Sequence, residues 1–221
     1  MSCSSLLLDI GNSRIKWMLT DAGGSTGPES IAHGGRLPPA LEKRWQSIAP
    51  PKHVLVSCVA HADIVSAVET LAARLWGIGI RRLVATREHD GLVNCYDHPE
   101  RLGIDRWLAM IGAHATVPGA FCVVDAGTAL TIDVVGPDGR HRGGLIVPGL
   151  SMMIESLRTG TAMPQYQEQG TPALLGCSTE SAIRLGCLRA LGAVVDRAIA
   201  DSGIDSPRPV SYTHLRAHET L

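Results

Sequence analysis

Apolar and polar residues follow two different periods along this chain, and together they predict a mixed α/β fold. Apolar stretches with the length of strands occur at 5–19, as two strands around a turn, at 53–59, at 81–85, and at 120–135, again as two strands. Apolar residues at helical spacing predict helices over 41–48, 63–75, 105–115, 151–157 and 178–200, and Ser178 is a suitable N-cap for the last. Residues 23–39 are rich in Gly, Ser and Pro, which predicts a loop. Strands that alternate with helices are typical of layered α/β domains.

A short repeat suggests that this layout occurs twice. Residues 5–12 and 121–128 both read as an apolar strand that ends in Asp-x-Gly followed by Asn or Thr, and a second apolar strand follows each copy. The repeat predicts two duplicated domains that face each other across a cleft.

The first copy, at Asp9 and Gly11, carries groups suited to binding phosphate. A carboxylate at the end of a buried strand is costly unless a cation accompanies it, and phosphate-bound Mg²⁺ would supply one. Gly11 lets the backbone approach an anion closely, and Lys16 could neutralise phosphate charge. An ordinary hairpin turn, in which Asp9 hydrogen-bonds its own loop, explains this turn equally well. The second copy, at Asp125, favours the interpretation that both turns grip one nucleotide.

A third candidate site lies at the start of the helix predicted at 105–115. Asp105 could act as a general base toward a substrate hydroxyl, and Arg106 could hold a substrate carboxylate through two hydrogen bonds. The structural alternative is that Asp105 interacts with the positive end of the helix and pairs with Arg106. The chain has neither a P-loop motif nor a dinucleotide-binding G-x-G-x-x-G motif.

The composition of the chain limits the kinds of partner that we expect. The 221 residues carry a net charge of −1, and the basic residues are scattered, so nucleic acid is not an expected partner. The apolar runs are too short for a membrane span or a signal peptide, so no membrane partner is expected. Six cysteines at irregular spacing, with no C-x-x-C, suit a reducing cytoplasm better than a disulfide framework or a zinc site.

In this order the motifs resemble those of the type III pantothenate kinases, which belong to the superfamily of acetate and sugar kinases, Hsp70 and actin. The resemblance covers about 6–200 and rests on the motifs at 9–16, 96–107, 125–129, 143–149, 158–162 and 178–183. It implies two duplicated ribonuclease H-like α/β domains, at 1–115 and 116–209, that flank an active-site cleft. It also implies ATP-dependent phosphorylation of pantothenate to 4'-phosphopantothenate, the first step of coenzyme A synthesis.

The resemblance also implies a role for individual residues. Asp105 would accept the proton of the pantothenate hydroxyl, with Tyr96, Gly103, Ile104 and Arg106 around the same substrate. Asp125 would bind a monovalent cation, K⁺ or NH₄⁺, and Mg²⁺ would accompany ATP. Thr179 would reach pantothenate across the interface of a homodimer. The residues implied for ATP are Asp9, Ile10, Gly11, Asn12, Ser13, Arg14, Ile15, Lys16 and Thr128.

The last residues depart from the family pattern. Residues 210–221 resemble one reading frame of a sequencing adapter, which suggests that the second domain is truncated near Pro209 and followed by a non-native tail. Two other functions stay open: another small-molecule kinase of the same superfamily, and a non-catalytic accessory factor in gene regulation. A panel of substrates would distinguish another small-molecule kinase from a pantothenate kinase. The Asp105→Asn substitution would distinguish an accessory factor from an enzyme, because an enzyme would lose phosphorylation whereas a binding module would keep its partner.

Overall fold

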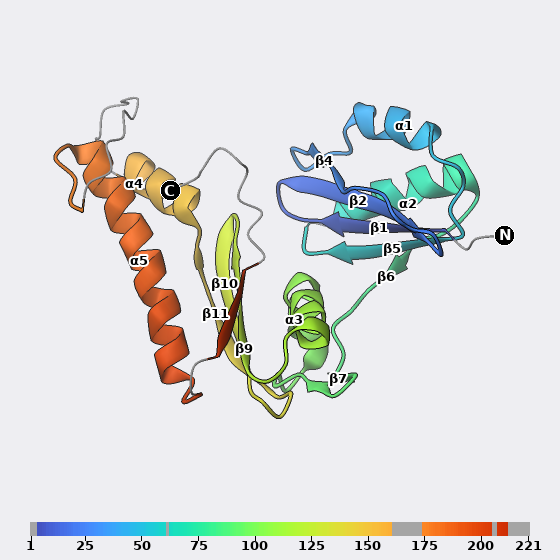
Figure 1. The fold of residues 1–221 in the computed structure, drawn as a ribbon. Coiled ribbons are helices and arrows are strands. Elements are labelled where there is room, and N and C mark those ends of the chain that lie inside the picture. Colours follow the sequence, from blue (N-terminus) through green and yellow to red (C-terminus); the bar gives the residue numbers. More distant parts are fainter. Residues whose placement is uncertain (1–3, 61, 161–173, 205–206, 212–221) are drawn as a thin grey trace. The chain divides into compact units, whose positions relative to one another are not determined.

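The computed structural model describes residues 4–60, 62–160, 174–204 and 207–211 (Figure 1). The chain forms two compact units. The first unit comprises Met1–Ala85 and Glu100–Trp107, and the second comprises Thr86–Pro99 and Leu108–Leu221. The domain limits implied by the family resemblance, 1–115 and 116–209, are not tested by this division and stay a prediction.

The first unit is built on a mixed sheet with the strand order β3-β2-β1-β5-β6, and β4 also pairs with β2. Its strands are β1 (Ser5–Ile10), β2 (Arg14–Asp21), β3 (Gly24–Ser25), β4 (Glu29–Ala32), β5 (His53–Cys58) and β6 (Arg81–Arg82). β1 runs antiparallel to β2 and parallel to β5. The predicted loop at 23–39 is therefore partly wrong, because β3 and β4 form there by pairing with β2. The strand predicted at 81–85 is shorter than expected.

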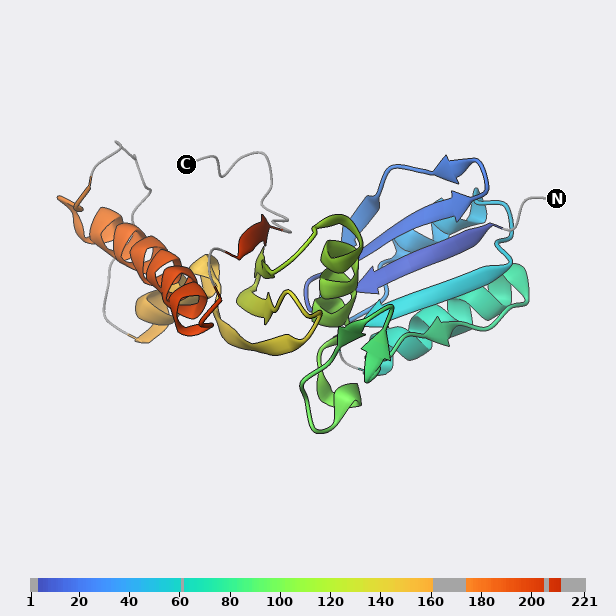
Figure 2. The same ribbon diagram turned by 60° about the horizontal axis from the view of Figure 1, so that its bottom comes forward.

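Two helices cover one face of this sheet, α1 (Pro39–Gln46) and α2 (Ala62–Trp76) (Figure 2). They correspond to the helices predicted at 41–48 and 63–75. Alternate residues of β1, namely Leu6, Leu8 and Ile10, are buried in one cluster with the apolar sides of both helices. Because successive side chains of a strand point to opposite faces, Asp9 points to the other face of the sheet.

The second unit contains a sheet with the strand order β11-β10-β9-β12. Its strands are β9 (Phe121–Ala126), β10 (Ala129–Val135), β11 (His141–Pro148) and β12 (Arg208–Ser211), and a separate hairpin pairs β7 (Glu88–His89) with β8 (Leu92–Val93). Its helices are α4 (Leu150–Gly160) and α5 (Thr179–Asp201); η1 (Pro99–Arg101) and α3 (Ile104–Thr116) have residues in both units. The pattern of apolar residues did not predict β11, whose Gly143 and Gly144 read as turn residues.

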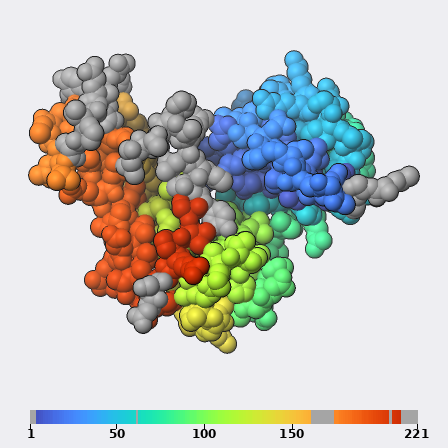
Figure 3. Space-filling view, viewed as in Figure 1, coloured from blue at the N-terminus to red at the C-terminus, as the bar shows by residue number. Residues whose placement is uncertain are grey.

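The helix predicted at 178–200 is confirmed as α5, and Ser178 is confirmed as its N-cap. Ser178 and Ser181 form a capping box, in which each side chain hydrogen-bonds the backbone N–H of the other residue. Leu191, Val194 and Val195 of α5 pack partly buried against β9 and β10. Figure 3 shows α5 at the surface of the second unit, in orange and red, and Cys187 is its buried residue.

The described residues include the first two residues of the predicted tail, Val210 and Ser211. Val210 and Ser211 are the last residues of β12 and pair with Val123 and Val124 of β9. Residues 212–221 lie outside the described residues, so the origin of the tail stays a prediction. Among the helices that the structure describes, none combines the length and the apolar character needed to cross a membrane.

Candidate active site

The turn between β1 and β2 holds the first group of predicted ATP residues. The Gly11 N–H donates to the Arg14 carbonyl over 3.0 Å and closes the hairpin around Asn12 and Ser13, which are exposed. Asp9 lies opposite Lys16, with 3.8 Å between Oδ2 and Nζ.

The carboxylate of Asp9 is not buried. Its side chain is 42% exposed, and the Ser57 hydroxyl donates to its Oδ1 over 3.3 Å. The premise that Asp9 is a buried charge that requires a cation is therefore wrong. Ile10 and Ile15 are fully buried core residues, so only their backbone could face a ligand. The role of this turn in binding ATP stays a prediction.

The sequence did not indicate that His33 supports this turn. The Nε2 of His33 lies 2.7 Å from the Gly11 carbonyl oxygen, and the His33 N–H donates to the Ser13 carbonyl over 3.0 Å. Since a carbonyl only accepts, Nε2 carries the proton. The contact between His33 and Gly11 depends on the pairing of β4 with β2, which no local pattern predicts.

Residues 103–106 form the start of α3. The Trp107 N–H donates to the Gly103 carbonyl over 3.0 Å, and Asp105 Oδ1 accepts a 2.8 Å hydrogen bond from the Arg106 backbone N–H. Ile104 and Arg106 are buried, whereas Asp105 is half-buried. A Cβ on Gly103 would lie 2.6 Å from Asp105 Oδ1. Gly103 therefore leaves the space that this carboxylate occupies.

In the second unit, Asp125 lies near the end of β9, and Thr128 lies in the turn between β9 and β10. Thr128 is exposed, and the Oδ1 atom of Asp125 is buried. The Gly149 N–H donates to the Thr128 carbonyl over 2.9 Å, and a Cβ on Gly149 would overlap backbone oxygens of Gly127 and Thr128. The residue after β11 thus packs directly on the turn, and only glycine fits there.

Tyr96 and Thr179 lie elsewhere in the second unit. The Tyr96 ring stacks on His141, with 6.2 Å between ring centroids. The guanidinium of Arg87 donates to the carbonyls of Tyr96 and Asp97, which holds the backbone of this segment. Thr179 is the first residue of α5 and is exposed.

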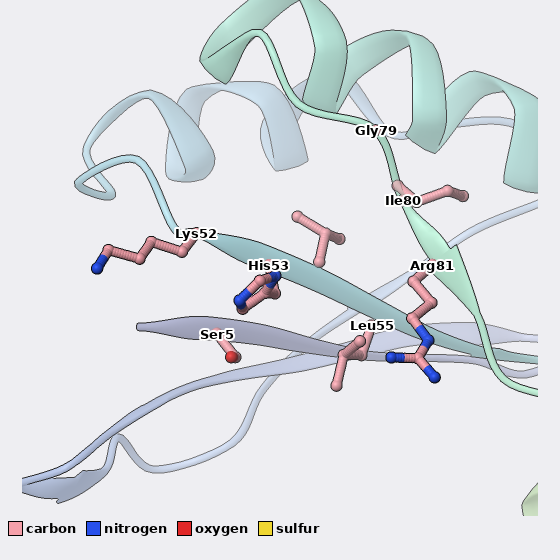
Figure 4. Close-up of a pocket in the computed structure, with 8 residues that line it drawn as sticks. Ser5, Lys52, His53, Leu55, Gly79, Ile80 and Arg81 are labelled. Atoms are coloured by element: carbon pink, nitrogen blue, oxygen red, sulfur yellow. The ribbon is translucent and has the colours of Figure 1, made fainter. Parts of the chain in front are cut away.

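A pocket of about 290 Å³ lies at the end of the first sheet that is opposite to Asp9 (Figure 4). Its lining includes Ser5 and His53, the first residues of β1 and β5, together with Arg81. In parallel strands of open α/β sheets, ligands bind beyond the carboxyl ends, where Asp9 and Gly11 are. The pocket contains none of the predicted site residues.

A sequence model of type III pantothenate kinase matches residues 5–201 of this chain. The chain belongs to the type III pantothenate kinase family. The type III pantothenate kinase of Halorhodospira halophila is 40% identical over 211 residues, which cover 89% of this chain and 80% of that protein. The type III pantothenate kinase of Methylibium petroleiphilum is 44% identical over 167 residues, which cover 71% and 65%.

Two solved structures support the fold of this type III pantothenate kinase family member. A conserved protein of the Baf family of transcriptional activators from Campylobacter jejuni has a TM-score of 0.50 and 19% identity, over 90% of this chain and 79% of that one. The activator of 2-hydroxyisocaproyl-CoA dehydratase from Clostridium difficile, solved with bound ADPNP, has a TM-score of 0.50 and 14% identity, over 97% and 80%. The predicted class, an actin-like α/β fold, is confirmed.

Proposed function

We propose that this chain transfers the γ-phosphoryl group of ATP to the hydroxyl of pantothenate and so catalyses the first step of coenzyme A synthesis. The observation that carries the proposal is family membership across 5–201, with 40% identity to a relative named type III pantothenate kinase. Phosphoryl transfer depends mainly on positioning and on neutralising charge, which the polar groups at these strand and helix ends can provide.

We assign Asp105 as the general base. Its carboxylate would take the proton of the pantothenate hydroxyl as that oxygen attacks the γ-phosphorus, and ADP would leave. Two features support the assignment: the Arg106 N–H holds Oδ1 in place, and Gly103 keeps the space around it open. On the family resemblance we also assign Tyr96, Gly103, Ile104, Arg106 and Thr179 to pantothenate binding.

The ATP phosphates would meet the turn after β1. Exposed Asn12 and Ser13 and the ammonium of Lys16 can donate hydrogen bonds to phosphate oxygens. On the family resemblance we also assign Thr128 to ATP. Mg²⁺ bound with ATP supplies further charge neutralisation on the phosphates.

Asp125 is the candidate ligand of a monovalent cation. Removing a carboxylate oxygen from water is costly, and its buried Oδ1 is the type of oxygen that a potassium ion would bind. Among the described residues, no group of three or more His, Cys, Asp or Glu could hold a metal. A potassium site would therefore need neutral oxygen ligands besides Asp125.

Replacing Asp125 with asparagine is expected to remove most of the activation by potassium, because the substitution removes the negative charge while keeping the shape of the side chain. The measurement is the rate of ADP release as potassium chloride is raised at constant ionic strength. Asp138→Asn, an exposed carboxylate of the same unit, is the control and should keep the wild-type response. An unchanged potassium response in Asp125→Asn would assign the cation to other residues.

A cytoplasmic homodimer completes the proposal. The described cysteines, Cys58, Cys95, Cys122, Cys177 and Cys187, form no disulfide with one another, as suits a reducing compartment. Large apolar side chains are exposed on β11 and α4, including Leu145, Ile146 and Met152, which suits a surface that a second copy covers. The net charge of −1 gives no basic field for nucleic acid.

The test is pantothenate-dependent release of ADP from Mg-ATP in the presence of potassium. Acetate and a panel of sugars are tested separately as alternative substrates. We expect ADP only with pantothenate, together with a phosphorylated product detected by mass spectrometry. Release with acetate or a sugar instead would favour another kinase of the superfamily. A folded protein that releases no ADP with any substrate would contradict the kinase assignment.

A further inference from the structure

A cysteine, a histidine and an aspartate form a connected group in the second unit, and none of the three is a residue assigned to the kinase reaction. Cys95 Sγ lies 3.3 Å from Nδ1 of His141, the first residue of β11. Nε2 of the same imidazole lies 2.9 Å from Oδ1 of Asp133 in β10. His141 and Asp133 are 2% and 1% exposed, whereas Cys95 is exposed.

The buried carboxylate decides which nitrogen of His141 carries the proton. An ionised carboxylate only accepts hydrogen bonds, so Nε2–H donates to Asp133. The neutral imidazole then presents the lone pair of Nδ1 to the thiol of Cys95. His141 can accept the thiol proton, and the resulting imidazolium keeps its bond to the Asp133 carboxylate. In this arrangement a base oriented by a carboxylate activates a nucleophile.

Two neighbours hold the group in place. Arg87 donates hydrogen bonds to the carbonyls of the residues before and after Cys95, Asn94 and Tyr96, so a guanidinium charge lies close to the Cys95 backbone. A nearby positive charge favours a thiolate. Tyr96 stacks on the His141 ring with an interplanar angle of 13°, which fixes the plane of the imidazole.

We propose that Cys95 is a reactive thiol that forms mixed disulfides with low-molecular-weight disulfides, with His141 as its base and Asp133 as a positioning residue. The Cys95 thiolate attacks one sulfur of the disulfide, and a new S–S bond forms as the original one breaks. The other half leaves as a thiolate, which takes up the proton held by His141. The protein thiol is oxidised and half of the small disulfide is reduced, so the exchange needs no further reagent.

This inference goes beyond the proposed kinase function and does not depend on it. Cys122 provides the contrast within the same sheet: burial, with a smaller effect of the Asp133 charge, raises the pKa of its thiol to about 11. Cys122 therefore stays protonated and inaccessible. Cys177, which is exposed, serves as the reference thiol in the same chain.

The experiment treats the full chain with glutathione disulfide at about pH 7 and follows each cysteine by peptide mapping. An ordinary thiol is only a few per cent ionised at this pH, so ionisation of Cys95 should raise its rate of reaction. A thiolate of lower basicity is a weaker nucleophile, which offsets part of this gain. We therefore expect Cys95 to react about tenfold faster than Cys177. Dithiothreitol should reverse the modification. Equal or slower reaction of Cys95 would overturn the proposal, whether or not the protein phosphorylates pantothenate.

A pair of matched variants tests the role of the buried carboxylate. Asp133→Asn is isosteric and should lower the rate at Cys95 to that of Cys177, while the rate at Cys177 stays unchanged. Asp138→Asn removes the same charge from the loop between β10 and β11 and should leave Cys95 at its wild-type rate. A folded Asp133→Asn variant with wild-type reactivity at Cys95 would refute the role of Asp133. If this variant does not fold, the wild-type comparison of Cys95 with Cys177 still decides the reactivity.

Discussion

Replacing Asp105 with asparagine is expected to lower kcat for pantothenate phosphorylation about a thousandfold, because the amide cannot accept the hydroxyl proton. A loss of this size corresponds to about 4 kcal/mol of transition-state stabilisation. The hydrogen bond from the Arg106 N–H to Oδ1 can persist in asparagine, so the start of α3 should keep its structure. The KM for ATP should change little. The measurement is steady-state ADP release with pantothenate and ATP varied in turn.

Asp63→Asn is the matched control for this substitution. Asp63 is the second residue of α2, as Asp105 is of α3, so both carboxylates interact with the positive end of a helix. Each variant should lose the same small helix-dipole stabilisation, but only Asp105→Asn should lose turnover. A folded Asp105→Asn protein with wild-type kcat would show that another group accepts the proton.

Replacing Gly149 with alanine is expected to destabilise the second unit by about 3 kcal/mol, since the new methyl group overlaps backbone oxygens that cannot move without the turn. The overlap is with the carbonyls of Gly127 and Thr128, the latter at 2.7 Å. For a chain of this size, the loss corresponds to a fall in Tm of about 10 °C. The KM for ATP should rise as well, because the turn that carries Thr128 must shift. Thermal unfolding and ATP titration measure the two effects.

Gly192→Ala is the control for the effect of adding one methyl group in the same unit. A Cβ at Gly192, in α5, would have no heavy atom within 4 Å outside the local helix. Alanine is the better helix former, so Tm should stay the same or rise by an amount that reflects up to about 1 kcal/mol. Equal destabilisation by both variants would mean that the contact between Gly149 and the β9–β10 turn is not tight in solution.

Several elements could be predicted because their signal is local. The helical spacing of apolar residues in α2 and α5, and the serine at the start of α5, are properties of neighbouring residues, and both helices end within two residues of their predicted limits. The strand–turn–strand layout of β1–β2 and β9–β10 is likewise local. The ordered set of motifs was enough to indicate the family, which the comparison with relatives confirms.

Local sequence patterns were therefore enough to indicate the elements with a regular period and the kinase family, whereas the way distant segments meet depends on the folded chain. Strand β4 and the support of Gly11 by His33 exist because β2 offers an edge for pairing. The partial exposure of Asp9 follows from which face of the sheet the helices cover. The contact of Cys95 with His141 joins residues 46 positions apart. The energy of such contacts depends on packing between segments that are remote in sequence, and a local pattern does not contain this information.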